Sequence, residues 1–152
     1  MWKKILLIPI LGLLFASLPA HAANPVNKTL FGGVAIHGYD PVAYFTQKKP
    51  VKGTKEWNFK WNDATWYFAS KENRDLFEKD PDQYAPQYGG YCAWAVANGS
   101  TADIDPDSWT IVDGKLYLNY NSKIQKKWEA DRQALIQKAN QEWPKLDDSQ
   151  KE

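Results

Sequence analysis

The sequence contains almost no cysteine or histidine. Cys92 is the one cysteine, and the two histidines are His21, beside an apolar N-terminal run, and His37. A disulfide framework needs paired cysteines, so the chain is not a disulfide-stapled scaffold. A structural zinc site draws four ligands mostly from cysteine and histidine, and here it would need two carboxylates that no motif supplies. Any thiol or imidazole chemistry outside the N-terminal run therefore depends on Cys92 and His37.

An excess of charge of either sign is also lacking. Lysine and arginine number 19 against 18 aspartates and glutamates, which gives a formal net charge of +1. Proteins that hold nucleic acid or an anionic membrane surface usually carry a basic excess. The composition therefore excludes nucleic acid as the expected partner and gives no support for an anionic membrane.

Long apolar runs are absent except at the N-terminus. Ile5 to Leu18 is almost wholly apolar, Lys3 and Lys4 precede it, and Ala20-His21-Ala22 follows with the small-x-small pattern of a cleavage site. The run is shorter than the about 20 residues that a membrane span needs. We therefore expect residues 1–22 to be a cleaved export signal rather than an uncleaved anchor. The mature protein would then be periplasmic or secreted, with no integral membrane segment.

Aromatic residues are abundant. The chain has 8 tryptophans, 8 tyrosines and 6 phenylalanines, and residues 23–146 are the length of one domain, followed by a polar tail at 147–152. Such density is typical of a core built from large rings. An aromatic ligand groove is the alternative, and the spacing alone does not separate the two.

Alternation of apolar and polar residues predicts two β-hairpins. Trp57, Phe59 and Trp61 alternate with polar residues before an Asn-Asp turn, and residues 65–69 return as a second strand. Farther along, Asp-Gly at 113–114 separates two alternating segments, which is typical of a two-residue hairpin turn with positive φ.

Helices are expected between and after the hairpins. Asp40 would cap a short helical turn, Ser70 would cap a helix that ends near Lys79, and residues 92–97 favour a short helix. Beyond the second hairpin, an apolar stripe predicts an amphipathic helix of about 18 residues that ends before a proline. The stripe consists of Ile124, Trp128, Leu135 and Ala139. The expected fold is a small single α+β domain, with two antiparallel hairpins in one core, short helices and a long C-terminal amphipathic helix.

Two segments of the chain resemble the YHS domain. Residues 38–45 (GYDPVAYF) and 66–81 (WYFASKENRDLFEKDP) reproduce that family's order of Asp-Pro-Val, a strand ending in Tyr-Phe, and a helix ending in Phe-x-x-Asp-Pro. Residues 88–96 (YGGYCAWAV) and 112–120 (VDGKLYLNY) resemble an extended, exported, stand-alone branch of the family. The resemblance implies a small module that is found alone or appended to metal-handling proteins.

The resemblance also implies where a metal would bind, and this chain departs from the family there. Metal-associated members place cysteines directly after Asp-Pro-Val, directly after Tyr-Phe, and again in the following helix. The corresponding residues are Ala43, Ala69 and Asn73, none of which is a soft metal ligand. We therefore expect the family's scaffold without its inherited metal site.

Cys92 and His37 remain as candidate metal ligands. A thiolate and an imidazole suit Cu(I), which accepts fewer and softer ligands than zinc, so copper is the cofactor that this pair would favour. Other interpretations stay open. A free cysteine often behaves as a small buried hydrophobe, and a lone histidine is often a surface or hydrogen-bonded residue. The two could also form a nucleophile and base, oriented by Asp40 or Asp105.

The expected function is that of an exported, non-enzymatic binding or accessory module of the YHS type, linked to metal handling through copper. No catalytic residue is predicted, and the partner would be a small ligand, a metal ion or a protein. The alternative is a small thiol-dependent enzyme that uses Cys92 with His37. The candidate ligand-binding residues are Cys92, His37, Tyr39, Asp40, Tyr91 and Trp94.

Overall fold

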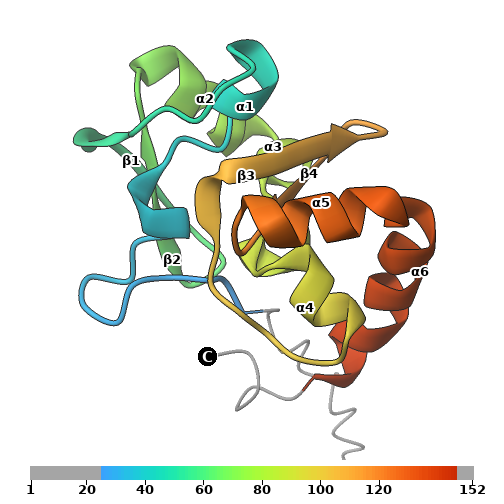
Figure 1. Ribbon diagram of the computed structural model, residues 1–152. Coiled ribbons are helices and arrows are strands. Elements are labelled where there is room, and N and C mark those ends of the chain that lie inside the picture. Colours follow the sequence, from blue (N-terminus) through green and yellow to red (C-terminus); the bar gives the residue numbers. More distant parts are fainter. Residues whose placement is uncertain (1–24, 147–152) are drawn as a thin grey trace, which may run out of the picture.

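The computed structural model describes residues 25–146. The expected export signal at 1–22 and the polar tail at 147–152 lie outside the described residues. Within residues 25–146, no helix is both long enough and apolar enough to cross a bilayer. The chain folds as an α+β structure with two antiparallel two-stranded sheets (Figure 1).

Both predicted hairpins are present. Strand β1 (Thr54–Trp61) pairs antiparallel with β2 (Ala64–Phe68), and β3 (Asp105–Val112) pairs antiparallel with β4 (Lys115–Asn119). The two residues of each connecting turn have positive φ: 50° and 57° at 62–63, and 51° and 74° at 113–114. Two-residue turns of this handedness match the right-handed twist of the strands that they join.

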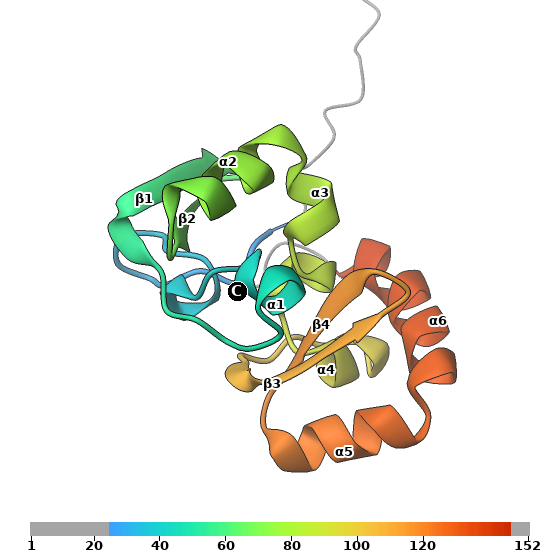
Figure 2. The same ribbon diagram turned by 90° about the horizontal axis from the view of Figure 1, so that it is seen from above.

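The hairpins share a hydrophobic core, although they do not pair with each other. Each forms its own two-stranded sheet, so the core that they were expected to share lies between two separate sheets. Trp66 and Phe68 of β2 nevertheless belong to the same buried cluster as Leu116 and Leu118 of β4. Figure 2 shows β3 and β4 between the first hairpin and the C-terminal helices, which is the position that allows this sharing.

Short helices connect the strands. Ser70 caps α2 as predicted, since its Oγ accepts a hydrogen bond from the Asn73 amide at 3.2 Å. The short α-helices are α1 (Ala43–Thr46), α2 (Lys71–Lys79), α3 (Pro81–Tyr84) and α4 (Ala93–Ala97). The 3₁₀ turns are η1 (Ile36–Gly38), η2 (Gln87–Gly90) and η3 (Trp143–Lys145).

The C-terminal region forms two helices, and the long amphipathic helix is not confirmed. Helix α5 (Ser122–Ala130) ends at Asp131, whose φ of −142° and ψ of 39° interrupt the helix before α6 (Arg132–Glu142) begins. The break turns α6 back along α4 (Figure 1). Trp128 of α5 and Ala139 of α6 are both fully buried, in a second cluster with Tyr117 and Val96.

Candidate functional site

A fully buried carboxylate, that of Asp40, lies at the centre of the YHS-like region. Its Oδ1 accepts hydrogen bonds from the amides of Val42 at 2.8 Å and Ala43 at 3.2 Å. Its Oδ2 accepts hydrogen bonds from the Ala69 amide at 2.8 Å and from Asn73 Nδ2 at 2.7 Å. We call this arrangement the Asp40 hub. A carboxylate has about four acceptor positions, and the hub provides a donor for each.

The hub joins the three positions at which metal-associated family members carry cysteine. Ala43 lies in α1, Ala69 directly follows β2 and Asn73 lies in α2, and each donates a hydrogen bond to Asp40. The resemblance therefore identified positions that do meet in space. Their side chains are two methyl groups and one amide, and this donor set does not fit a copper or zinc ion.

Cys92 lies at the start of α4 with its side chain buried. The residue is 1% exposed, and its thiol is 3.5 Å from Oδ1 of Asn119, which is also fully buried. The same oxygen accepts a hydrogen bond from the Trp94 amide at 3.1 Å, and this bond fixes the orientation of the Asn119 side chain. Burial raises the pKa of the Cys92 thiol. The neutral thiol is therefore the favoured form in the folded protein.

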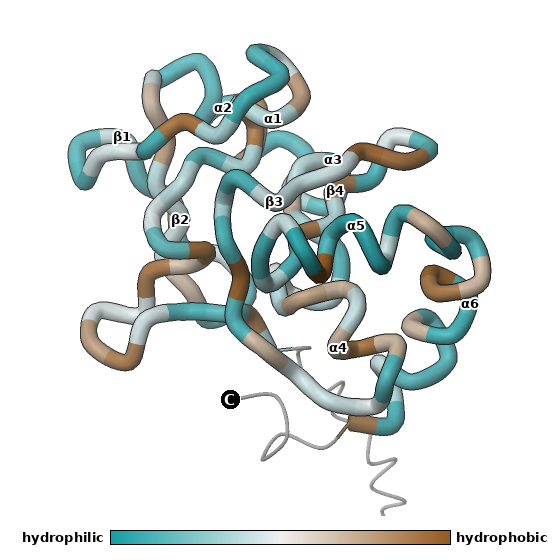
Figure 3. The backbone as a smooth tube through the Cα atoms, in the orientation of Figure 1, coloured by the Kyte–Doolittle hydropathy of each residue, from teal (hydrophilic) through white to brown (hydrophobic). Residues whose placement is uncertain are grey.

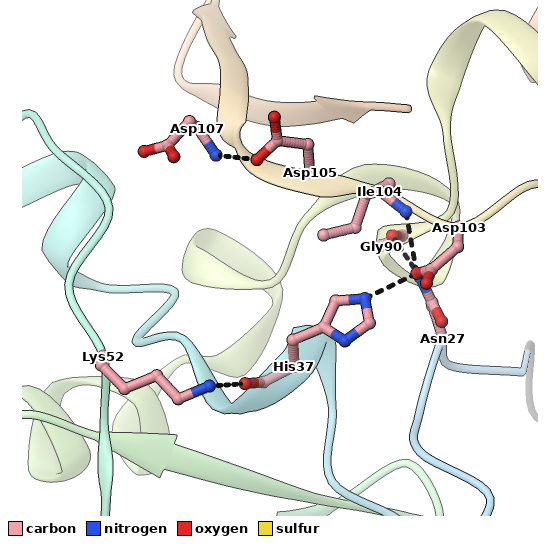
Figure 4. A network of polar contacts seen from close by, with 8 residues as sticks. All are labelled: Asn27, His37, Lys52, Gly90, Asp103, Ile104, Asp105 and Asp107. Carbon is pink, nitrogen blue, oxygen red and sulfur yellow. Dashed lines mark hydrogen bonds and ion pairs between the residues drawn. The ribbon is translucent and has the colours of Figure 1, made fainter. Parts of the chain in front are cut away.

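His37 contacts an acidic residue that sequence reasoning did not single out. Its Nε2 is 2.7 Å from Oδ1 of Asp103, and the two side chains are 40% and 55% exposed. Asn27 Nδ2 and the Ile104 amide donate to the same oxygen, at 3.0 Å and 2.8 Å. Figure 4 shows this network, in which the His37 carbonyl also accepts a hydrogen bond from Lys52 Nζ.

The hydrogen bonds of this network determine the ionisation of Asp103. Partial burial acts to raise the pKa of its carboxyl. Hydrogen bonds from Asn27, Ile104 and His37 outweigh this effect, so the pKa lies below its usual value. The ionised carboxylate thus connects the N-terminal segment, η1 and the segment before β3.

The structure gives Cys92 and His37 different partners. The thiol contacts Asn119, and the imidazole contacts Asp103 rather than either of the two expected orienting acids. Of those acids, Asp40 is held in its hub, and Asp105 Oδ1 accepts from the Asp107 amide at 3.0 Å. In the part of the chain from 25 to 146, no group of three or more His, Cys, Asp or Glu side chains is arranged to hold a metal ion.

The aromatic candidate residues take part in packing. The Tyr39 ring lies 4.8 Å from Lys52 Nζ, and the Trp94 ring lies 5.9 Å from Lys127 Nζ. Tyr91 is buried and packs on Trp143, with ring centroids 6.1 Å apart. These contacts explain the three rings as parts of the scaffold. Whether any of them also touches a ligand stays a prediction.

A cleft of about 780 Å³ lies between the first hairpin and the C-terminal helix. Its lining includes four aromatic residues from separate elements: Trp61 and Trp66 of the first hairpin, Tyr88 of η2, and Trp143 of η3. Trp61 is half-buried, whereas the other three are buried. We call this feature the aromatic cleft. Sequence reasoning allowed for an aromatic groove but could not locate it, because its walls are far apart in the chain.

Polar groups complete the aromatic cleft. Asp82 of α3, Lys115 at the start of β4 and Asn140 of α6 also line it, and all three are exposed. The Tyr88 hydroxyl lies 2.9 Å from Asn140 Oδ1, which ties η2 to α6. The cleft therefore offers one carboxyl group, one amine and one amide beside the half-buried ring of Trp61.

The N-terminal segment fixes one side of the cleft through a glycine. Asn27 donates its amide hydrogen to the Gly89 carbonyl at 2.8 Å, next to Val26, which lines the cleft. A Cβ at Gly89 would meet the Pro25 carbonyl oxygen at 2.0 Å, and the φ of Gly89 is +64°. The backbone around Pro25 thus packs directly against Gly89, and a side chain at this position would prevent that contact.

Comparison with known proteins supports the resemblance to the YHS domain, and it leaves Cys92 and His37 outside the matched range. Residues 42–88 match the family model described as YHS domain. No solved structure gave a significant match. The matched range contains Ala43, Ala69 and Asn73, but His37 precedes it and Cys92 follows it, so neither inherits a role from the match. The chain therefore contains a YHS domain at residues 42–88, as its motifs predicted.

Proposed function

We propose that this protein is an exported, non-enzymatic binding module of the YHS type that takes a small polar organic ligand in its aromatic cleft. The observation that carries the proposal is the combination of the half-buried Trp61 ring and three exposed polar residues around about 780 Å³, with the buried Trp66, Tyr88 and Trp143 behind them. Sites for small molecules typically enclose about 300–1,000 Å³ and combine aromatic surface with a few polar groups that orient the ligand.

The residues of the cleft indicate the chemistry of the ligand. Trp61 is the most accessible of the four rings and provides a flat surface against which an apolar face can stack. Asp82, Lys115 and Asn140 provide an acceptor, a donor and an amide within the same cleft. A molecule with one flat apolar face and several hydroxyl groups, such as a sugar ring, matches this set.

The copper expectation receives little support from the geometry. The YHS family is linked to metal handling, but the family's ligand positions are closed by the Asp40 hub. Copper at Cys92 and His37 would require the thiol to leave Asn119 and the imidazole to leave Asp103. We keep the conditional prediction that any metal bound would be Cu(I), held by Cys92.

Nothing in the described geometry favours the thiol-dependent enzyme. A catalytic cysteine acts as a thiolate and needs a base within hydrogen-bond reach. Burial raises the pKa of Cys92, and His37 is paired with Asp103 instead. The proposal therefore assigns Cys92 a packing role at the start of α4.

The test is a binding titration with a panel of monosaccharides, disaccharides and nucleosides, followed by tryptophan fluorescence and by thermal unfolding. We expect at least one compound of the panel to bind the wild type and to raise its unfolding temperature, because a ligand of the folded state stabilises that state. The variant Asp82→Ala/Lys115→Ala removes two exposed cleft residues and should lose most of this effect. Lys126→Ala removes an exposed lysine that does not line the cleft and should keep it. A panel without any binder, or equal binding by both variants, would contradict the proposal.

A further inference from the structure

Two neighbouring apolar side chains project from the surface at the tip of the loop formed by residues 29–34. Leu30 is 90% exposed and Phe31 is 88% exposed. Figure 1 shows this loop extending away from the body of the protein, and Figure 3 shows hydrophobic residues at its tip. Single exposed apolar residues are ordinary, but two adjacent ones at a projecting tip indicate an interaction surface.

Hydrogen bonds hold the loop in this shape. The Thr29 amide donates to the Val34 carbonyl at 2.9 Å, and the Val34 amide donates to Thr29 Oγ1 at 3.0 Å. The Thr29 hydroxyl donates to the Phe31 carbonyl at 2.8 Å, and the Thr65 amide of β2 donates to the Gly33 carbonyl at 2.8 Å. The apolar tip is therefore a fixed feature of the fold, and docking it would cost little ordering entropy.

Lysines surround the loop on both sides. Lys52 and Lys55 line a groove on one side together with Phe31, and Lys28 and Lys60 line a second groove on the other side. The acidic residue among the lining residues of these two grooves is Asp63, which pairs with Lys28 at 2.8 Å. The neighbourhood of the loop is thus basic, although the whole chain is nearly neutral.

We propose that loop 29–34 docks onto a lipid bilayer with anionic headgroups. Leu30 and Phe31 would enter the interfacial region, while Lys55 and Lys60 contact phosphate groups. Lys28 and Lys52 already have partners within the protein, in Asp63 and in the His37 carbonyl. Shallow burial of leucine and phenylalanine, combined with basic residues at the surface, is the usual mode of interfacial attachment.

A bilayer fits this surface better than a protein partner does. A stable protein interface buries about 1,200–2,000 Å² around an apolar centre, whereas this surface is a narrow tip bordered by charged side chains. Insertion of the tip needs no complementary pocket. The inference is independent of the aromatic cleft, because none of the loop residues lines that cleft.

The experiment is co-sedimentation of the protein, recovered from the exported fraction, with vesicles of phosphatidylcholine alone or mixed with phosphatidylglycerol. We expect binding only to the mixed vesicles, and weaker binding at high salt. The Leu30→Ser/Phe31→Ser variant should bind at least about tenfold more weakly, since each buried side chain of this kind contributes at least that factor. Lys55→Glu/Lys60→Glu should also bind at least about tenfold more weakly, because lysines near an anionic surface act additively.

The control is Tyr120→Ser, which removes a 53% exposed aromatic residue beyond β4 and should bind like the wild type. All variants are prepared in the same way and share the same N-terminus. Any vesicle binding by apolar N-terminal residues is therefore equal in all of them, and a difference in binding reports on the loop. Unchanged binding by Leu30→Ser/Phe31→Ser would overturn the proposal. Failure of the wild type to bind the mixed vesicles would also overturn it, and so would self-association of the protein through Leu30 and Phe31 in place of vesicle binding.

Discussion

The carboxylate of Asp40 connects three segments of the YHS domain that are separate in sequence. It receives hydrogen bonds from α1, from the residue directly after β2 and from α2. Four hydrogen bonds stabilise the buried carboxylate. Its removal would leave the four donors buried without an acceptor, which costs free energy of folding. The positions that hold cysteine in metal-associated members are in this way part of a hydrogen-bonded joint.

Asp40→Ala should therefore lower the free energy of unfolding by about 3–5 kcal/mol, because it leaves four donors without their acceptor and each unpaired buried donor costs about 1–3 kcal/mol. The measurement is urea unfolding followed by tryptophan fluorescence. Asp107→Ala is the control, because Asp107 is exposed and its carboxylate should contribute little. A loss below about 1 kcal/mol in Asp40→Ala would mean that the hub does not hold the three segments together.

The burial of Cys92 leads to a prediction about its reactivity. Because burial raises the pKa of the thiol above its usual value of 9.0, alkylation of the folded protein near pH 8 should be at least about a hundredfold slower than in urea. The unfolded thiol ionises first as pH rises, so the contribution of Cys92 to stability is present below pH 9 and is lost above it. Cys92→Ala should remove this contribution and leave the loss above pH 10 that arises because burial raises the pKa of Tyr44, Tyr88 and Tyr117. Rapid alkylation of the native protein would show an accessible thiol.

At the scale of secondary structure, local signals predicted most elements correctly. The turn residues at 62–63 and 113–114 indicated both hairpins, and Ser70 indicated the start of α2. The break at Asp131 escaped prediction because apolar residues keep the same helical period on both sides of it. The sequence also could not show that the two hairpins meet through side chains rather than through backbone pairing.

Trp128 tests how α5 is attached. Its side chain is fully buried and packs on Tyr117 of β4, with ring centroids 5.2 Å apart. Trp128→Ala should lower the free energy of unfolding by about 3–5 kcal/mol. Trp128→Phe should cost less, because it keeps a ring and removes an indole nitrogen that has no hydrogen-bond partner within residues 25–146. A loss below about 1 kcal/mol in the alanine variant would mean that α5 packs loosely.

At the scale of the whole molecule, tertiary structure brings together groups that composition and spacing could not locate. His37 and Asp103 are 66 positions apart, and the aromatic cleft takes residues from both hairpins and from η3. The near-neutral net charge likewise gave no sign of the lysines that cluster around loop 29–34 in the folded protein. The family motifs predicted the YHS domain, while the sites outside residues 42–88 required the fold.

Export is the prediction that concerns the whole chain most directly. The basic start, the apolar run and Ala20-His21-Ala22 favour cleavage after Ala22. Intact-mass measurement of the exported protein should give a chain that begins at Ala23. A mass that includes residues 1–22 would contradict the cleavage, and absence of the protein from the exported fraction would contradict export itself.

The most direct test of a YHS domain without its metal site is a competitive titration of the reduced protein with a Cu(I) chelator. Because the family positions hold Ala43, Ala69 and Asn73, the chelator should keep its copper. Wild type, Cys92→Ser and His37→Ala should therefore give the same result. Withdrawal of copper by the wild type but not by Cys92→Ser would contradict this account and show a thiolate copper site.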